Sequence, residues 1–114
     1  MNNDETINEL LSLSRFLGEE HRNLAILGEG NTSAKIDDDT FMVKASGSCL
    51  QTLGVDDVVA CRFDRLLPML DLDDLSDQDI EDHLLACRVY PSTKKPSVET
   101  LFHAYLLTLP DVKC

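Results

Sequence analysis

The chain has 114 residues, and its 21 acidic side chains against 10 basic ones give a formal net charge of −11. This charge repels phosphate backbones and anionic lipid, and the basic residues are scattered, so nucleic acid and membrane surfaces are excluded as partners. No stretch approaches the roughly 20 apolar residues of a membrane span, and the first residues do not resemble a signal peptide. A cytoplasmic location is therefore expected. Since 43% of the residues are hydrophobic, a single domain with a real core is also expected.

The N-terminal residues predict an amphipathic helix. Asp4 can cap it, and Gly18 marks its end. The residues expected on its buried face are Ile7, Leu10, Leu11, Ser14, Phe16 and Leu17.

A β-hairpin is predicted next. Residues 24–27 form a short apolar run and residues 28–31 a glycine turn. Two strands follow, over residues 32–36 and 40–44, and the three aspartates at 37–39 turn the chain between them.

The remaining pattern alternates short strands and helices. Residues 50–53 predict one helical turn, residues 57–63 a third strand and residues 64–70 a short helix. Ser76 can cap a longer helix over residues 77–89.

The last predicted helix covers residues 98–107, with Ser97 as its cap. Residues 111–114 predict the start of another strand. A sheet that stops there would leave an unpaired edge, so the isolated chain is expected to be marginally stable or to associate.

Metal sites are weakly supported by the sequence. The four cysteines contain no C-x-x-C pair, so reduced and mostly buried thiols are expected at Cys49, Cys61, Cys87 and Cys114. His83 lies four residues before one of them, but two ligands alone make a weak site. Residues 71–82 resemble a calcium loop only in part, because Ser76 stands where that loop needs glycine, and a solvated acidic loop is favoured.

Three turns rich in small residues predict an anion site. They are residues 28–33, with Gly30 and Asn31, residues 45–48, with Ser46 and Gly47, and residues 96–97, with Ser97. Backbone amides and hydroxyls in such turns can hold one phosphate, helped locally by Lys44 or Lys94. On local grounds, Glu99 only complements a helix dipole, and His103 is a structural histidine rather than a metal ligand.

Read together and in order, three motifs resemble the N-terminal portion of the class II aldolase/adducin family. They are GEGNTSAK at 28–35, VKASG at 43–47 and PSVETLFHAY at 96–105. The lysine before Ala-Ser-Gly and the Ser-x-Glu-Thr form are most similar to the branch of bifunctional rhamnulose-phosphate aldolase/dehydrogenase proteins.

The resemblance implies a three-layer α/β/α fold around a mainly antiparallel sheet, of which residues 1–114 would be the N-terminal half of one incomplete domain. It also implies zinc-dependent aldol cleavage of a sugar phosphate, often by a homotetramer. The residues implied in phosphate binding are Gly30, Asn31, Ser46, Gly47 and Ser97. Glu99 would be the catalytic acid or base, which replaces its local interpretation as a dipole partner.

Two departures from the family pattern limit these implications. Val98 stands where many members have a second phosphate-binding serine. The family's His-x-His zinc ligands are missing, since His21, His83 and His103 do not have that spacing. We therefore expect no metal ligands in this chain and no aldolase activity from it alone. A non-catalytic, adducin-like interaction module is the alternative, and the sequence does not specify the sugar.

Overall fold

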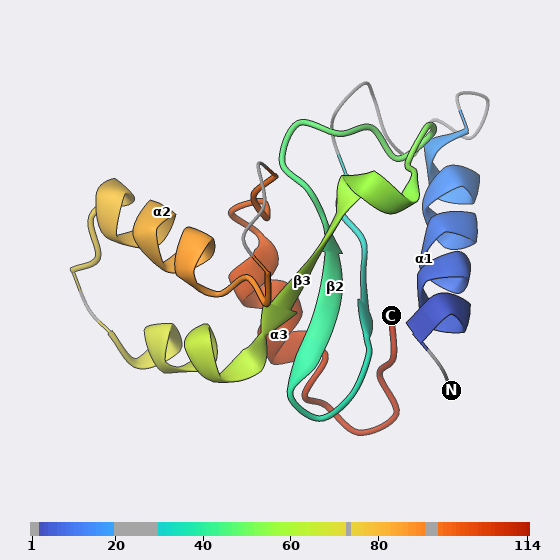
Figure 1. Ribbon diagram of the computed structural model, residues 1–114. Coiled ribbons are helices and arrows are strands. Elements are labelled where there is room, and N and C mark those ends of the chain that lie inside the picture. The colour runs from blue at the N-terminus through green and yellow to red at the C-terminus, as the bar shows by residue number, and fades with distance from the viewer. Residues whose placement is uncertain (1–2, 20–29, 73, 91–93) are drawn as a thin grey trace.

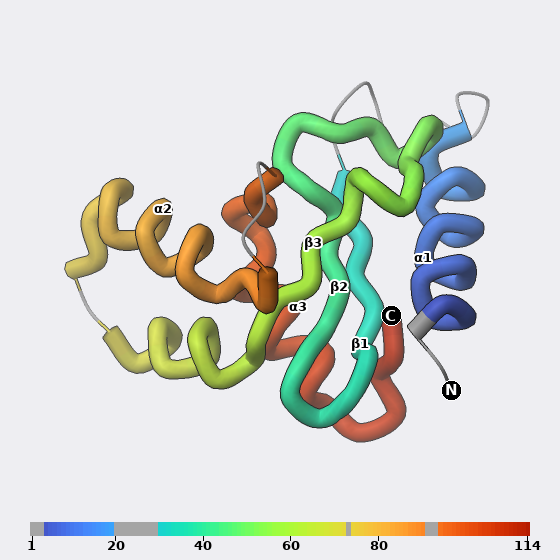
Figure 2. Tube along the Cα trace, viewed as in Figure 1, coloured from blue at the N-terminus to red at the C-terminus, as the bar shows by residue number. Residues whose placement is uncertain are grey.

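The computed structural model describes residues 3–19, 30–72, 74–90 and 94–114 (Figures 1 and 2). The predicted apolar run at 24–27, the first half of the glycine turn and His21 lie outside these residues. In chain order the elements are α1 (Asn3–Gly18), β1 (Ser33–Lys35), β2 (Thr40–Lys44), the 3₁₀ turn η2 (Val55–Asp57), β3 (Val58–Arg62), the 3₁₀ turns η3 (Phe63–Arg65) and η4 (Leu67–Asp71), α2 (Asp77–Ala86) and α3 (Thr100–Leu106).

The described strands form one antiparallel sheet in the order β1-β2-β3. Ser33 pairs with Val43, and Phe41 pairs with Cys61. The predicted hairpin is confirmed, and its turn is closed by the Asp37 carboxylate, which accepts hydrogen bonds from two backbone N–H groups. Those bonds, led by the one from the Asp39 N–H, lower the pKa of Asp37.

Helices cover both faces of this sheet, as Figure 1 shows. Consecutive side chains of a strand point to opposite faces. The Thr32 hydroxyl lies 2.6 Å from that of Ser14 on α1, whereas the next hydroxyl, on Ser33, lies 2.6 Å from Nδ1 of His103 on α3. The predicted α/β/α layering around an antiparallel sheet is therefore confirmed.

The larger core lies between the sheet and the C-terminal helices. The Phe41 and Phe63 rings meet there with centroids 4.7 Å apart. The buried cluster consists of Phe41, Val43, Ala45, Val59, Cys61, Phe63, Leu66, Met69, Leu84, Cys87, Ala104 and Leu107. None of the four cysteines is in a disulfide, and Cys114 is exposed rather than buried.

Helix α1 covers the other face with a narrower apolar stripe than predicted. Leu10, Leu11 and Ser14 are buried, but Phe16 is 47% exposed. At 3.6 residues per turn, Phe16 points roughly 120° away from Leu10 and roughly 160° away from Ser14. Its assignment to the buried face was wrong.

Several elements in the middle of the chain differ from the predictions in type or in length. Residues 50–53 form a hydrogen-bonded turn rather than a helix, and residues 63–71 form two 3₁₀ turns. The Ser76 cap is confirmed, since its hydroxyl accepts from the Asp79 N–H. Helix α2 nevertheless ends at Ala86, because the Val89 N–H bonds to Ala60 of β3 instead.

The C-terminal residues do not form the predicted strand. They instead run beside β1, where the Lys113 carbonyl accepts a hydrogen bond of 2.8 Å from the Lys35 N–H (Figure 2). The edge predicted to be unpaired therefore has a partner at this position. Within the described ranges, no helix has the length and apolar character needed to cross a membrane.

Candidate functional site

Three segments that are far apart in the sequence meet around one cavity of about 420 Å³. All six residues that the sequence predicted for the site line it. The complete lining among the described residues is Gly30, Asn31, Lys44, Ser46, Gly47, Ser97, Val98 and Glu99.

The first segment approaches β1 and presents the Asn31 amide. Gly30 has a φ of 94°, a conformation that favours glycine, and it turns the chain into the strand. The Asn31 Nδ2 donates to the Ser97 hydroxyl and, at 3.4 Å, to the Glu99 carboxylate. Within the described part of the chain, its Oδ1 is buried without a hydrogen-bond partner. Asn31 therefore joins the first segment to the third and keeps one unused acceptor.

The second segment is the turn after β2. The Ala45 N–H donates to the Asp57 carbonyl at 2.8 Å, and the Ser46 N–H donates to the Lys95 carbonyl at 2.8 Å. Gly47 has a φ of 85°, yet a Cβ there would meet no atom within 4 Å. This glycine is therefore required by backbone conformation and not by lack of space.

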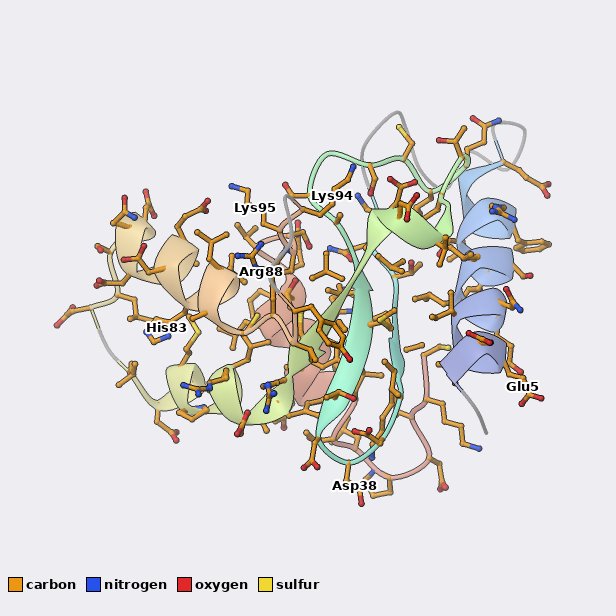
Figure 3. The ribbon with its side chains drawn as sticks, in the orientation of Figure 1. Glu5, Asp38, His83, Arg88, Lys94 and Lys95 are labelled. Atoms are coloured by element: carbon orange, nitrogen blue, oxygen red, sulfur yellow. The ribbon has the colours of Figure 1, made fainter. Side chains whose placement is uncertain are left out.

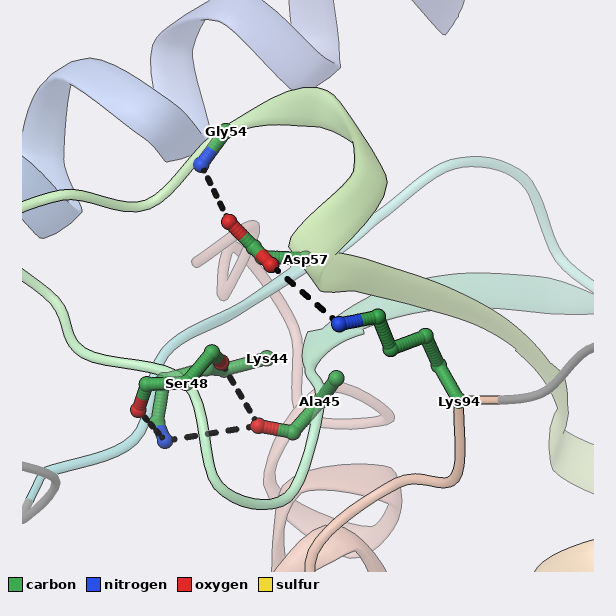
Figure 4. A network of polar contacts seen from close by, with 6 residues as sticks. All are labelled: Lys44, Ala45, Ser48, Gly54, Asp57 and Lys94. Carbon is green, nitrogen blue, oxygen red and sulfur yellow. Dashed lines mark hydrogen bonds and ion pairs between the residues drawn. The ribbon is translucent and has the colours of Figure 1, made fainter.

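Lys44 supplies a buried positive charge beside this turn. The residue is 2% exposed, and its Nζ donates to the carbonyls of Ser48 at 2.7 Å and Ala45 at 3.4 Å (Figure 4). Burial lowers the pKa of this ammonium, while the nearby Cys49, Glu99 and Asp57 side chains oppose the shift. Lys94, the alternative cation, does not line the cavity, and its Nζ lies 3.7 Å from the Asp57 carboxylate. Of the two predicted lysines, Lys44 is therefore the one that lines the cavity.

The third segment differs from the prediction at the helix start. Helix α3 begins at Thr100, and its N-cap residue is Glu99, not Ser97. The Ser97 hydroxyl accepts from the Asn31 amide across the cavity, and Ser97 is 9% exposed. The Ser97 side chain therefore lines the cavity and bonds to Asn31 instead of capping the helix.

The Glu99 side chain is exposed at the cavity mouth, and its pKa is lowered. The largest cause is a hydrogen bond from its own backbone N–H, opposed by partial burial and assisted by Ser97 and Asn31. Glu99 is therefore ionised at neutral pH and available as a proton acceptor.

His103 lies four residues further along α3. Its Nδ1 is 2.6 Å from the Ser33 hydroxyl, and burial lowers the pKa of its imidazole, opposed by the Glu99 charge. It lines a second, mostly apolar cavity of about 320 Å³, which also has Asn31 in its wall. The sequence placed this histidine beneath the site but did not identify Ser33 as its partner. The matching spacings, Asn31 to Ser33 and Glu99 to His103, are the signal that could have indicated it.

The donor groups do not fit a zinc site. Across residues 3–19, 30–72, 74–90 and 94–114, no group of three or more histidine, cysteine or acidic side chains could hold a metal ion. Glu99 and His103 offer two donors, one fewer than a catalytic zinc needs from protein.

Comparison with known proteins decides the family. The model of the class II aldolase and adducin N-terminal domain matches residues 8–114. This chain belongs to the class II aldolase and adducin family. The N-terminal class II aldolase domain of a conserved protein from Thermoplasma acidophilum superposes on 96% of the chain with a TM-score of 0.78 and 34% identity. The uncharacterized oxidoreductase YuxG of Bacillus subtilis is 32% identical over 108 residues, which is 88% of this chain.

Both relatives are longer than the matched region. This class II aldolase-like chain spans 53% of the Thermoplasma acidophilum structure and 16% of the Bacillus subtilis protein. The likeness therefore identifies the type of domain that the chain forms.

Proposed function

We propose that this chain forms the anion-binding and acid/base part of a class II aldolase-like lyase that acts on a sugar phosphate. The observation that carries the proposal is the meeting of residues 30–31, 44–47 and 97–99 around one polar cavity. Hydroxyls, one buried ammonium and the backbone amides that are not already bonded within the protein can hold a single phosphate even though the whole chain carries a charge of −11. Family membership supports the same function.

Each segment has a distinct proposed role. The turn with Ser46 and Gly47, together with Ser97, holds the phosphate oxygens, and Gly30 allows close approach of the backbone. Lys44 supplies the positive charge. Asn31 orients the Glu99 carboxylate, which accepts or returns a proton on the substrate.

We further propose that the 114-residue polypeptide alone binds no catalytic zinc and cleaves no ketose phosphate. The support is that its three histidines do not form the family's His-x-His pair. Purified protein should show no stoichiometric zinc binding in calorimetry and no carbonyl product from ketose phosphates with zinc present. Tight one-to-one zinc binding, or turnover above a heat-denatured sample, would contradict this proposal.

Phosphate binding tests the anion site directly. Asn31→Ala removes a cavity-lining amide that holds both the Ser97 hydroxyl and the Glu99 carboxylate, and losing its hydrogen bonding in the phosphate complex should cost about 1 to 1.5 kcal/mol of binding free energy. We expect this variant to bind inorganic phosphate about tenfold more weakly than the parent in an NMR titration. Asn8→Ala on the exposed surface of α1 is the matched control and should change nothing. Equal affinity in parent and Asn31→Ala would remove Asn31 from the site, and no binding by the parent would reject the anion site.

A further inference from the structure

Two side-chain contacts connect the β1 segment with α3 in parallel. In the first, the Asn31 amide reaches Glu99 at 3.4 Å. In the second, the Ser33 hydroxyl lies 2.6 Å from Nδ1 of His103. The Lys44 N–H bonds to the Thr32 carbonyl, so the extended ladder reaches back to the residue between Asn31 and Ser33.

The spacings of these two contacts match. Residues two apart in an extended chain point the same way and lie roughly 6.6 Å apart. Residues four apart on a helix share a face, with Cβ atoms roughly 6 Å apart. Asn31 therefore faces Glu99, and Ser33 faces His103. The distance between the two contacts is similar along the strand and along the helix. A change in the Ser33–His103 contact would therefore shift the Asn31–Glu99 contact.

The Ser33–His103 contact is more buried than the Asn31–Glu99 contact. Ser33 is 4% exposed and is held in the sheet by its pairing with Val43. Helix α3 contributes Ala104, next to His103, to the buried core. The Asn31–Glu99 contact involves an exposed side chain, because Glu99 precedes the first residue of the helix. The buried Ser33–His103 contact therefore fixes how α3 lies against β1, and this determines where Glu99 lies at the cavity mouth.

We propose that the Ser33–His103 hydrogen bond is the positioning contact of the anion cavity, fixing the separation between the Asn31 amide and the Glu99 carboxylate. This inference rests on the proposed anion-binding function of the same cavity. Neither residue lines that cavity, so both act through their neighbours. The charged group that acts on this pair is Glu99, the N-cap residue of α3, and Glu99 in turn interacts with Lys44 on β2.

The first experiment measures inorganic phosphate affinity by NMR titration. Ser33→Ala and His103→Gln both break the contact, since glutamine places its amide near the position of Nε2 rather than Nδ1. Each should weaken binding about five- to tenfold, because a Glu99 carboxylate that loses its Asn31 partner is no longer held away from the bound phosphate that it repels. The double variant should be no weaker than either single one, because all three lose the same bond. His103→Asn places an amide where Nδ1 stood and should restore affinity to within twofold of the parent.

Matched controls separate positioning from loss of structure. Thr108→Ala removes a hydroxyl just beyond α3, and His83→Asn and His83→Gln change a histidine on α2 that lies away from the cavity (Figure 3). All three should leave phosphate affinity unchanged. Circular dichroism must show each variant folded at the titration temperature. Folded Ser33→Ala and His103→Gln with parental affinity would overturn the proposal, as would failure of His103→Asn to exceed His103→Gln.

A second measurement does not depend on phosphate. The Glu99 carboxyl can be titrated by ¹³C NMR, and its pKa in the parent lies below the ordinary value of 4.5, partly because Asn31 and Ser97 bond to it. Loss of positioning should raise this pKa in Ser33→Ala and leave it unchanged in Thr108→Ala. If the parent binds no phosphate but the pKa rises as expected, the proposed function fails and the positioning contact stands. An unchanged pKa rejects the positioning contact.

Discussion

Replacing Glu99 with glutamine should raise the affinity of this chain for inorganic phosphate about tenfold at pH 7.5. Glu99 lines the same cavity as the groups proposed to hold phosphate, and its lowered pKa keeps it negatively charged. Like charges about 6 Å apart, at an effective dielectric constant of about 40 for a partly exposed site, repel by about 1.4 kcal/mol, which is a factor of ten. Glutamine keeps the shape and can still accept the Asn31 hydrogen bond. NMR titration with phosphate gives the ratio of affinities.

The control for this variant is Asp38→Asn. Asp38 lies at the tip of the β1–β2 hairpin and does not line the cavity (Figure 3). Asp38→Asn removes one negative charge from the net −11, as Glu99→Gln does, so it reports the effect of overall charge alone. We expect this effect on phosphate affinity to be less than twofold. Equal gains in both variants would show that phosphate responds to overall charge and that Glu99 is not beside it.

The pH dependence of the ratio tests the same argument. Sulfate is the suitable probe because it stays doubly charged over the range. The pKa of Glu99 is lowered below its ordinary value of 4.5, so at neutral pH the ionised carboxylate of the parent repels the bound anion. This repulsion disappears as the pH falls through the lowered pKa and Glu99 becomes protonated. The ratio of sulfate affinities, Glu99→Gln to parent, should therefore fall from about ten toward one. Other groups titrate in both proteins and cancel from the ratio.

The residues that the sequence predicted for the site could be selected because their signals are local, and the structure brings them together around one cavity. Gly30 and Gly47 indicate turns in the sequence because glycine tolerates a positive φ, and both residues have a positive φ in the structure. The family motifs then ordered the turns along the chain. The pairing of β1 with β2 followed from the short loop between them, since such a hairpin has few alternatives.

The parts that sequence could not provide depend on contacts between distant residues. The choice of Lys44 over Lys94 depends on the Ser48 carbonyl and on Asp57, which lie in separate turns. Ser97 was predicted to cap a helix, a common local role, but its hydroxyl bonds instead to Asn31, 66 positions earlier. Local propensity is overruled at such positions because the tertiary contact uses the same hydroxyl.

Gly18 shows the same limit, since its predicted position was correct but its physical reason was different. It ends α1, as expected, yet its φ is not in the left-handed region that a glycine cap usually needs. A Cβ at this position would lie 2.3 Å from the Gln51 backbone nitrogen and 2.7 Å from the Leu50 carbonyl carbon. The glycine is required because the turn at residues 50–53 crosses the end of the helix.

Gly18→Ala should therefore destabilise the chain by about 2 to 4 kcal/mol. Helix propensity alone would make alanine favourable by up to about 1 kcal/mol, but the clash is with backbone atoms that no rotamer change can relieve. The contact is also tied by Arg15, whose Nε donates to the Leu53 carbonyl at 2.8 Å. Urea unfolding followed by circular dichroism measures the free energy of unfolding.

Two other glycines make the comparison decisive, because each isolates one effect. Gly47→Ala meets no atom but keeps a φ of 85°, so strain alone should cost about 1 kcal/mol. Gly54→Ala has an ordinary contact of 3.6 Å with the Asp57 carboxylate and a φ of −118°, so its free energy of unfolding should change by less than about 1 kcal/mol. The order of destabilisation should be Gly18, then Gly47, then Gly54. If Gly18→Ala were as stable as the parent, α1 could not end against the backbone of residues 50–51, and the turn that follows the Ser46–Gly47 segment would have another support.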